Sequence, residues 1–311
     1  MARIGTSDLD VYPLCLGGNV FGWTSDEQQS FAVLDAYAAA GGNFIDTADV
    51  YSVWAEGNSG GESETVIGRW LARRGRRDDL VIATKVGQLP TAKGLSAANI
   101  KVAVEGSLRR LGTGHIDLYY AHIDDSTVPL AETLGTFTEL VKEGKVRYLA
   151  ASNYDTDRLA EALEISKREN LASYVALQPE YNLVEREGYE GKLAALVAIE
   201  GLSAVPYWGL AKGFLTGKYR PGVTVDSPRA AGAGAYLDER GLRVLAVLDE
   251  LAAAHRSSVA SVALAWLGAQ STVVAPIASA RTVEQLDDLL GAATLELAEG
   301  EIQRLTEASA R

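Results

Sequence analysis

The sequence predicts an α/β protein that folds as a single (β/α)8 barrel, or TIM barrel, over residues 1–311. Eight short apolar runs alternate with amphipathic helical stretches, which is the pattern of β–α units around a parallel sheet. No linker or charge block divides the chain, and Leu16 to Gly22 lack the glycine spacing of a dinucleotide-binding open sheet. The expected barrel strands are 14–18, 43–46, 80–85, 116–122, 146–152, 174–178, 202–207 and 272–277.

Helix and loop signals lie between these strands. Ser25 and Gln28 have the spacing of a capping box, and the segment after them has helical periodicity. Two apolar helical stripes are formed by Phe31, Leu34 and Ala38 and by Ile100, Val104, Leu108 and Leu111. Residues 3–11 are expected to form a β-hairpin at the barrel bottom, and extra helices are expected at the C-terminal end. The long segments 52–62 and 220–236 follow strands, so we expect them at the catalytic face as mobile loops.

Composition limits the classes of function. The formal net charge of −12 opposes binding to nucleic acid or to anionic lipid, because both require clustered Lys and Arg. The single cysteine, Cys15, lies in an apolar run and is expected to be a buried, unreactive thiol. The N-terminus has no apolar leader, and no run is as long as a membrane span. We therefore expect a cytoplasmic protein with a small-molecule substrate and with neither nucleic-acid nor membrane partners. No feature indicates an oligomeric state.

Four polar residues occur at or near the carboxyl ends of predicted strands. Asp46, Lys85 and His122 each end a strand, and Tyr51 follows Asp46 by five positions. The carboxyl ends of barrel strands converge on one mouth, where these side chains can meet. Taken singly, each residue also has a structural explanation, such as a loop cap or a packed ring. Taken together, the four form a set that can reduce a carbonyl group.

The chemistry of this set is general acid catalysis. A Tyr phenol has a pKa of about 10 and becomes a better acid when a neighbouring ammonium stabilises its phenolate. Lys85 can supply that charge and Asp46 can pair with it, while His122 orients the substrate carbonyl and Tyr51 protonates the developing alkoxide. A metal site is not expected, because only one of three histidines is suitably placed, and the nucleophile elbow of acyl-transfer enzymes is missing.

Several motifs resemble those of the aldo-keto reductase family, in the family's order and over nearly the whole chain. They are GNFIDTADVYS (42–52), GESE (61–64), ATKVG (83–87), IDLYYAH (116–122), EGKVRY (143–148), ASNY (151–154), QPEYNL (178–183) and GFLTGKY (213–219). The sequence Tyr51-Ser52-Val53-Trp54 is similar to a bacterial branch of the family. The resemblance implies an oxidoreductase barrel that binds NADP(H) across the strand ends, with Asp46, Tyr51, Lys85 and His122 as its catalytic tetrad.

The same resemblance implies a site for NADPH. Three polar residues would bind the nicotinamide carboxamide, and Tyr207 would stack on the ring. Lys212 matches a position near the pyrophosphate, and Arg281 suits a 2′-phosphate. The full set implied is Gly18, Asn19, Ser152, Asn153, Gln178, Tyr207, Leu210, Lys212, Ser279, Arg281 and Gln285.

This sequence also departs from the family's usual pattern. Ala278-Ser279 replaces Pro-Gly or Pro-Lys in the segment that the resemblance assigns to the adenosine end of the cofactor, and Trp208-Gly209 replaces Ser-Pro after the stacking aromatic residue. A third departure is Ala150-Ala151, where relatives carry a glycine.

Aromatic residues on predicted strand-end loops point to the substrate. Trp23, Trp54, Trp208 and Phe21 are expected to wall an apolar cleft, with ordinary packing as the alternative. Three hypotheses follow: a broad aldehyde or ketone reductase, a pathway-specific keto-sugar or secondary-metabolite reductase, and a cofactor-binding regulatory subunit resembling channel β-subunits.

Overall fold

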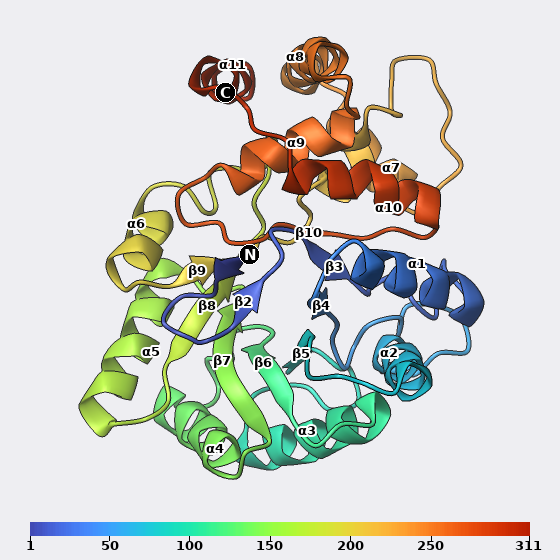
Figure 1. The fold of residues 1–311 in the computed structure, drawn as a ribbon. Helices are drawn as coiled ribbons and strands as arrows, with labels where there is room; N and C mark the ends of the chain where they lie inside the picture. Colours follow the sequence, from blue (N-terminus) through green and yellow to red (C-terminus); the bar gives the residue numbers. More distant parts are fainter.

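A computed structural model describes all residues, 1–311. Eight parallel strands form one curled sheet in the order β10-β3-β4-β5-β6-β7-β8-β9, with helices around its outside (Figure 1). The strands are β3 (Cys15–Gly17), β4 (Phe44–Asp46), β5 (Val81–Val86), β6 (Ile116–Ala121), β7 (Val146–Ser152), β8 (Tyr174–Gln178), β9 (Ser203–Ala204) and β10 (Ile277–Ala278). This arrangement confirms the predicted (β/α)8 fold.

The helices follow the strands in chain order. Those between β3 and β9 are α1 (Glu27–Ala39), α2 (Glu62–Arg74), α3 (Ala97–Leu111), α4 (Leu130–Lys142), α5 (Thr156–Glu169) and α6 (Lys192–Ile199). After β9 come η1 (Ala211–Thr216), α7 (Ala230–Gly234), α8 (Glu239–His255) and α9 (Val259–Gly268), and after β10 come α10 (Val283–Leu290), η2 (Gly291–Ala293) and α11 (Glu299–Ala308). The C-terminal helices confirm the expected additions to the barrel, and no helix combines the length and apolar character needed to cross a membrane.

Two prolines explain why the last two strands are shorter than predicted. The predicted strand 202–207 contains Pro206, which has no N–H to donate, so the ladder stops after β9 and resumes as a single bridge at Tyr207. In the predicted strand 272–277, Pro276 has the same effect. Residues 272–274 pair with β9, whereas β10 begins after the proline and pairs with β3. This segment therefore joins the two ends of the sheet.

The capping box of α1 lies one residue later than predicted. The cap is Asp26, whose carboxylate accepts from the N–H of Gln29 at 2.8 Å, while the Gln29 side chain accepts from the Asp26 N–H. Ser25 is not the cap because its hydroxyl donates to the carbonyl of Arg281 at 3.3 Å. The predicted stripe of α3 is buried as expected, but in α1 Phe31 and Ala38 are only half-buried, and the buried face is Ser30, Val33, Leu34 and Tyr37.

The N-terminal hairpin packs against the bottom of the barrel, as predicted. Strands β1 (Ala2–Arg3) and β2 (Asp10–Val11) pair antiparallel, and the Gly5 N–H donates to Ser203 Oγ at 2.8 Å. Its apolar side chains join one core cluster with Cys15 and the barrel interior. Burial raises the pKa of the Cys15 thiol well above its usual range, which agrees with an unreactive cysteine.

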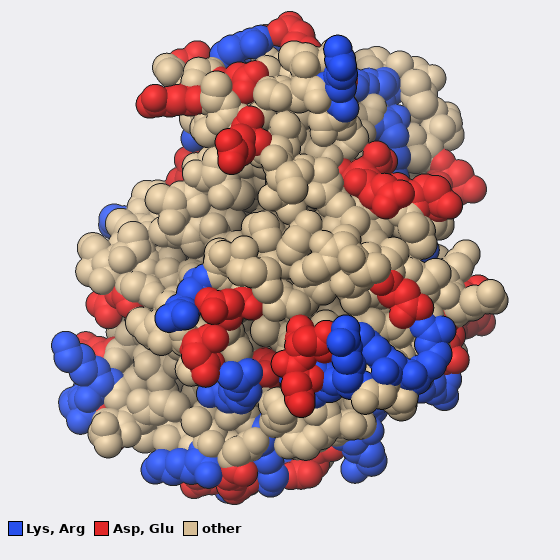
Figure 2. Space-filling view, viewed as in Figure 1, with Lys and Arg blue, Asp and Glu red and all other residues tan.

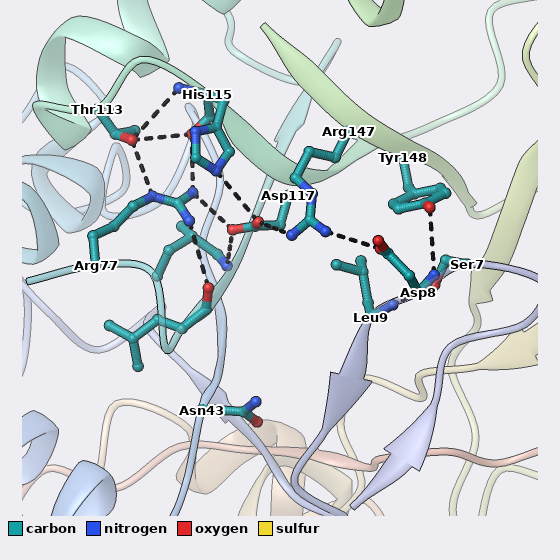
Figure 3. A network of polar contacts seen from close by, with 12 residues as sticks. Ser7, Asp8, Leu9, Asn43, Arg77, Thr113, His115, Asp117, Arg147 and Tyr148 are labelled. Atoms are coloured by element: carbon teal, nitrogen blue, oxygen red, sulfur yellow. Dashed lines mark hydrogen bonds and ion pairs between the residues drawn. The ribbon is translucent and has the colours of Figure 1, made fainter. Parts of the chain in front are cut away.

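An ionic network around the buried side chain of Asp117 lies beside this hairpin (Figure 3). Asp117, near the start of β6, accepts from Arg77 Nη2 at 2.7 Å, from Arg147 Nη1 at 2.9 Å and from the Ile82 N–H at 2.9 Å. Arg147 also donates to Asp8 of the hairpin at 2.9 Å. The network therefore ties the hairpin to β5, β6 and β7. On the rest of this face acidic and basic side chains are interspersed, with no broad basic patch (Figure 2).

Replacing Asp117 should destabilise the fold and spare the mouth of the barrel. We expect Asp117→Ala to lower the free energy of unfolding by about 3 kcal/mol, because it leaves two arginines beside an empty, buried position. The exposed pair of Glu27 with Arg69 provides a control, since Glu27→Ala should cost less than about 1 kcal/mol. Chemical denaturation measures both variants, and equal losses would contradict the structural role of the network.

Candidate active site

The structure brings the four predicted residues together at the mouth of the barrel. Asp46 ends β4, Lys85 is the penultimate residue of β5, His122 follows β6, and Tyr51 lies in the loop after β4. Lys85 Nζ donates to Asp46 Oδ2 at 2.7 Å, to Tyr51 Oη at 2.8 Å and to the Thr47 carbonyl at 2.8 Å. Tyr51 Oη donates to Asp46 Oδ2 at 3.0 Å.

Burial determines the protonation of these groups. Lys85 has no exposed surface, and burial lowers its pKa, while the neighbouring Asp46 carboxylate acts in the opposite direction. Burial and the Asp46 charge raise the pKa of Tyr51 well above its usual range. Tyr51 therefore keeps its proton at neutral pH, and the ammonium beside it is ready to stabilise a phenolate.

His122 faces the same site in its neutral form. Its ring is edge-on to the Tyr51 ring, with the ring centroids 6.1 Å apart. Burial, followed by the charge of Lys85, lowers the pKa of His122 well below its usual range. The His122 backbone is held by its N–H on the Val86 carbonyl and by its own carbonyl, which accepts from the side chains of Gln88 and Asn153.

A cavity of ≈ 600 Å³ opens in front of these residues. Tyr51, Asp46 and His122 line it, whereas Lys85 lies behind Tyr51 and does not reach its surface. The predicted cofactor and substrate residues that line this cavity are Asn19, Ser152, Asn153, Gln178, Tyr207, Leu210, Lys212, Ser279, Trp54 and Trp208.

A second cavity, of ≈ 310 Å³, adjoins the first and carries most of the local positive charge. The two cavities share Leu210, Lys212, Arg229 and Ser279 in their linings. Lys212, Lys218, Arg229 and Arg281 line the second cavity, and none of them forms an ion pair with a carboxylate. Burial and then the charge of Arg281 lower the pKa values of Lys218 and Arg229. An anionic ligand would relieve this repulsion, so the two cavities together fit a long molecule that carries phosphate groups.

Local contacts already order several of the predicted cofactor residues. Ser279 Oγ donates to Asn19 Oδ1 at 2.8 Å, and Tyr207 Oη donates to Asn153 Oδ1 at 2.9 Å. Gln285 lines the second cavity and accepts from the Arg281 N–H at 3.0 Å. Gln178 Nε2 donates to the free oxygen of Asp46 at 3.0 Å, so this amide also supports the tetrad.

Three sequence-based expectations need correction or refinement. Gly18 is buried and lines neither cavity, because its N–H donates to the Asp46 carbonyl and its own carbonyl accepts from Ser63 Oγ. Phe21 was expected in the substrate cleft, but its ring has no exposed surface and belongs to the core. Trp23 lines the second cavity and contacts Trp54 edge-on, with ring centroids 5.6 Å apart.

Sequence reasoning missed two of the unpaired cations. Lys218 lies in the GFLTGKY motif, where its lack of an acidic neighbour within the motif was the available signal. Arg229 lies in the long segment 220–236 and lines both cavities, where its guanidinium lies 5.7 Å from the centre of the Trp23 ring. The path of that segment depends on tertiary packing, so its sequence gave no comparable signal.

Trp208 has an unusual backbone conformation beside the stacking residue. Its φ of 52° lies in the left-handed region, which a bulky side chain rarely adopts. The carbonyl of Trp208 is fixed in this turn, because it accepts from Asn182 Nδ2 at 3.0 Å and from the Ala211 N–H at 2.7 Å. Its indole is 38% exposed and contacts the Lys212 ammonium, 4.3 Å from the ring centre. Burial of the ring therefore does not account for the strain.

Comparison with known proteins identifies the class to which this fold and site belong. Residues 13–310 match the model of the aldo/keto reductase family. The chain belongs to this family, whose members are oxidoreductases that act on small-molecule carbonyl substrates.

Three relatives illustrate the range of the similarity. The uncharacterized oxidoreductase YrpG of Bacillus subtilis is 35% identical over 304 residues, which cover 94% of this chain and 91% of that protein. A probable voltage-gated potassium channel subunit beta of Oryza sativa is 33% identical, covering 91% of this chain and 88% of its own. Norsolorinic acid reductase B of Dothistroma septosporum is 31% identical, covering 96% of this chain and 79% of its own.

Proposed function

We propose that this protein is an NADPH-dependent aldo-keto reductase that reduces an aldehyde or ketone to an alcohol, with Tyr51 as the general acid. The observation that carries the proposal is the protonated Tyr51 hydroxyl, which lies at the surface of the large cavity and 2.8 Å from the Lys85 ammonium. When bound, the cofactor supplies the hydride.

The residues of the site then have separate roles. Neutral His122 donates a hydrogen bond to the substrate oxygen and orients the carbonyl. The Tyr51 hydroxyl, which donates to Asp46 in this structure, turns toward the same oxygen and protonates it as negative charge develops. Lys85 stabilises the resulting phenolate, and Asp46 holds the ammonium in place. The buried Asp46–Lys85 pair thus makes the weakly acidic Tyr51 phenol an effective proton donor, and the pair itself does not have to move.

The cofactor would extend over both cavities. Ser152, Asn153 and Gln178 would hold the carboxamide and Tyr207 would stack on the nicotinamide ring, because all four line the large cavity near the tetrad. Lys212 and Arg229 line both cavities and fit the pyrophosphate, and Lys218 adds charge beside them. Arg281, together with Ser279 and Gln285, would bind the adenosine end and its 2′-phosphate.

The lining of the large cavity favours an apolar, aromatic carbonyl substrate. Trp54, Trp208 and Ile123 line it and are 48%, 38% and 36% exposed, so large apolar surfaces face open space there. No acidic residue other than Asp46 lines the cavity, and Lys85 already neutralises that carboxylate.

The complete tetrad and the open cavity support an enzyme over a purely regulatory subunit. One relative is named a probable voltage-gated potassium channel subunit beta, so the regulatory alternative needs a test of its own. Turnover by the purified protein is therefore the decisive test.

Replacing the general acid should abolish turnover and spare the cofactor site. With NADPH and a panel of aldehydes, ketones and quinones, Tyr51→Phe should lower kcat by about a thousandfold, since it removes the proton donor. Loss of NADPH absorbance measures turnover, and fluorescence titration measures NADPH binding, which should change by less than about threefold. Turnover at the wild-type rate would refute the assignment of Tyr51.

Removing the Arg281 guanidinium should weaken the binding of NADPH and have little effect on the binding of NADH. We expect Arg281→Ala to raise the Kd for NADPH by about tenfold or more and to change the Kd for NADH by less than about twofold, since only NADPH has a 2′-phosphate. Arg281→Lys should recover part of the affinity as a matched control. Equal weakening of both cofactors would contradict the proposed contact.

Trp208 offers a test of the substrate class. Trp208→Gly should fold at least as stably as the wild type, because glycine adopts a φ of 52° without strain. It should lower kcat/KM by about tenfold for 2-naphthaldehyde and by less than about twofold for propanal, with Trp208→Phe close to the wild type. The same loss for both aldehydes would remove the aromatic preference and leave the reaction class intact.

A further inference from the structure

Asp49 is a buried acid that the proposed reaction does not use. It lies between Asp46 and Tyr51, is 1% exposed, and neither of its carboxyl oxygens has a hydrogen-bond partner. The backbone N–H groups of Thr47 and Asp49 donate to the carbonyls of Ala83 and Lys85, so this segment continues the ladder beside β5. Asp49 does not line the cavity, whereas Asp46, Val50 and Tyr51 do.

Every charged neighbour of Asp49 is already engaged with another group. Glu64 of α2 is fully buried, and its two oxygens accept from Thr84 Oγ1 at 2.6 Å and from Arg110 Nε at 2.7 Å. Arg110 of α3 forms its ion pair with Glu64, not with Asp49.

Lys85 of β5 is unavailable for the same reason. Its three N–H donors have three acceptors, which are Asp46, Tyr51 and the carbonyl of Thr47. The remaining polar neighbour is Tyr119 of β6, whose buried hydroxyl also has no partner. In this structure no side-chain donor forms a hydrogen bond to Asp49, so an ionised carboxylate would have no side chain holding it.

The charge balance of this region also disfavours an ionised Asp49. Lys85 and Arg110 balance Asp46 and Glu64, so an ionised Asp49 would add one uncompensated negative charge in a buried place. Burial, and then the charge of Glu64, raise the pKa of Asp49 to about 7, against the weaker effects of Arg110, Lys85 and the backbone N–H of Val50. An ionised Asp49 also acts on its neighbours, because its charge raises the pKa of Lys85 and of Tyr119.

We propose that Asp49 is a positioning residue that carries a proton in the folded enzyme at mildly acidic pH, and that release of this proton as the pH rises through neutrality makes Tyr51 a weaker acid. The reason is electrostatic. Protonation of the substrate converts Tyr51 into a phenolate, and an added negative charge behind Lys85 disfavours that phenolate. Reduction should therefore be faster while Asp49 is neutral and slower once it is ionised. This inference rests on the proposed function for its catalytic part.

The raised pKa of Asp49 also determines the direction in which this residue changes the stability of the protein with pH. An unfolded Asp has a pKa of about 3.9, so between about pH 4 and pH 7 the folded protein holds a proton that the unfolded chain has lost. The contribution of Asp49 to wild-type stability should fall as pH rises through this range and then level off. Asp49→Asn is neutral in both states and should lack this fall.

The experiment compares Asp49→Asn with the wild type from pH 5 to pH 8.5 in two measurements. The Tm of the variant relative to the wild type should increase by about 5 °C between pH 5 and pH 8. The ratio of the kcat values for NADPH-dependent reduction, variant over wild type, should rise about threefold between pH 6 and pH 8.5. Asp157→Asn, at an exposed residue with no ion pair, makes the same change in charge and should leave both comparisons flat. Asp49→Ser serves as a second neutral variant if the amide does not fold.

Each outcome decides the inference. Both changes together support it. A Tm difference that is independent of pH overturns the protonation of Asp49, and a pH-dependent Tm difference with a flat kcat ratio overturns its link to Tyr51. A wild-type protein without turnover on any carbonyl would refute the proposed function and the catalytic part of this inference, while the Tm comparison, which needs no turnover, would still test the proton on Asp49.

Discussion

An ammonium group without access to water needs an acceptor for each of its N–H donors, and Lys85 finds three at the end of β5. The acceptors are the Asp46 carboxylate at the end of β4, the backbone carbonyl of Thr47 and the phenol of Tyr51. The register of β4 with β5 therefore sets the position of the acid relative to its supporting charge. Removing any one acceptor would leave a buried N–H of Lys85 unpaired. The ammonium therefore constrains the ends of β4 and β5, the loop after β4 and the ring of Tyr51 together.

The fold was predictable where long apolar strands and strand-end polar residues coincide. β5 to β8 lie within one residue of their predicted bounds, and the four residues of the tetrad meet because strand ends converge. The errors have local causes, since Pro206 and Pro276 interrupt ladders that hydrophobicity alone would extend. Arg229 could not be assigned from its sequence, because its place between the two cavities depends on how a long loop packs. Asp49 was equally hidden, since an acid in a loop is usually solvated.

Function in this barrel is divided between its two ends. The hairpin and the Asp117 network hold the bottom, where no candidate catalytic group lies. The unpaired cations, the exposed indoles and the left-handed backbone of Trp208 are all at the mouth, where each is unfavourable without a ligand. Strain and repulsion are tolerated there because the rest of the barrel is densely packed and well paired.

The closure of the sheet by residues 272–278 has a consequence for how the chain reaches its native state. β3 pairs with β10, which lies more than 250 positions later in the sequence, and β9 completes its ladder with the same segment. Until that segment leaves the ribosome, the nascent barrel has two unpaired strand edges. Such edges invite pairing with other chains, and contacts between distant residues form slowly. Residues 272–278, almost nine-tenths of the way along the polypeptide, thus decide whether the preceding strands become a closed barrel or an aggregation-prone open sheet.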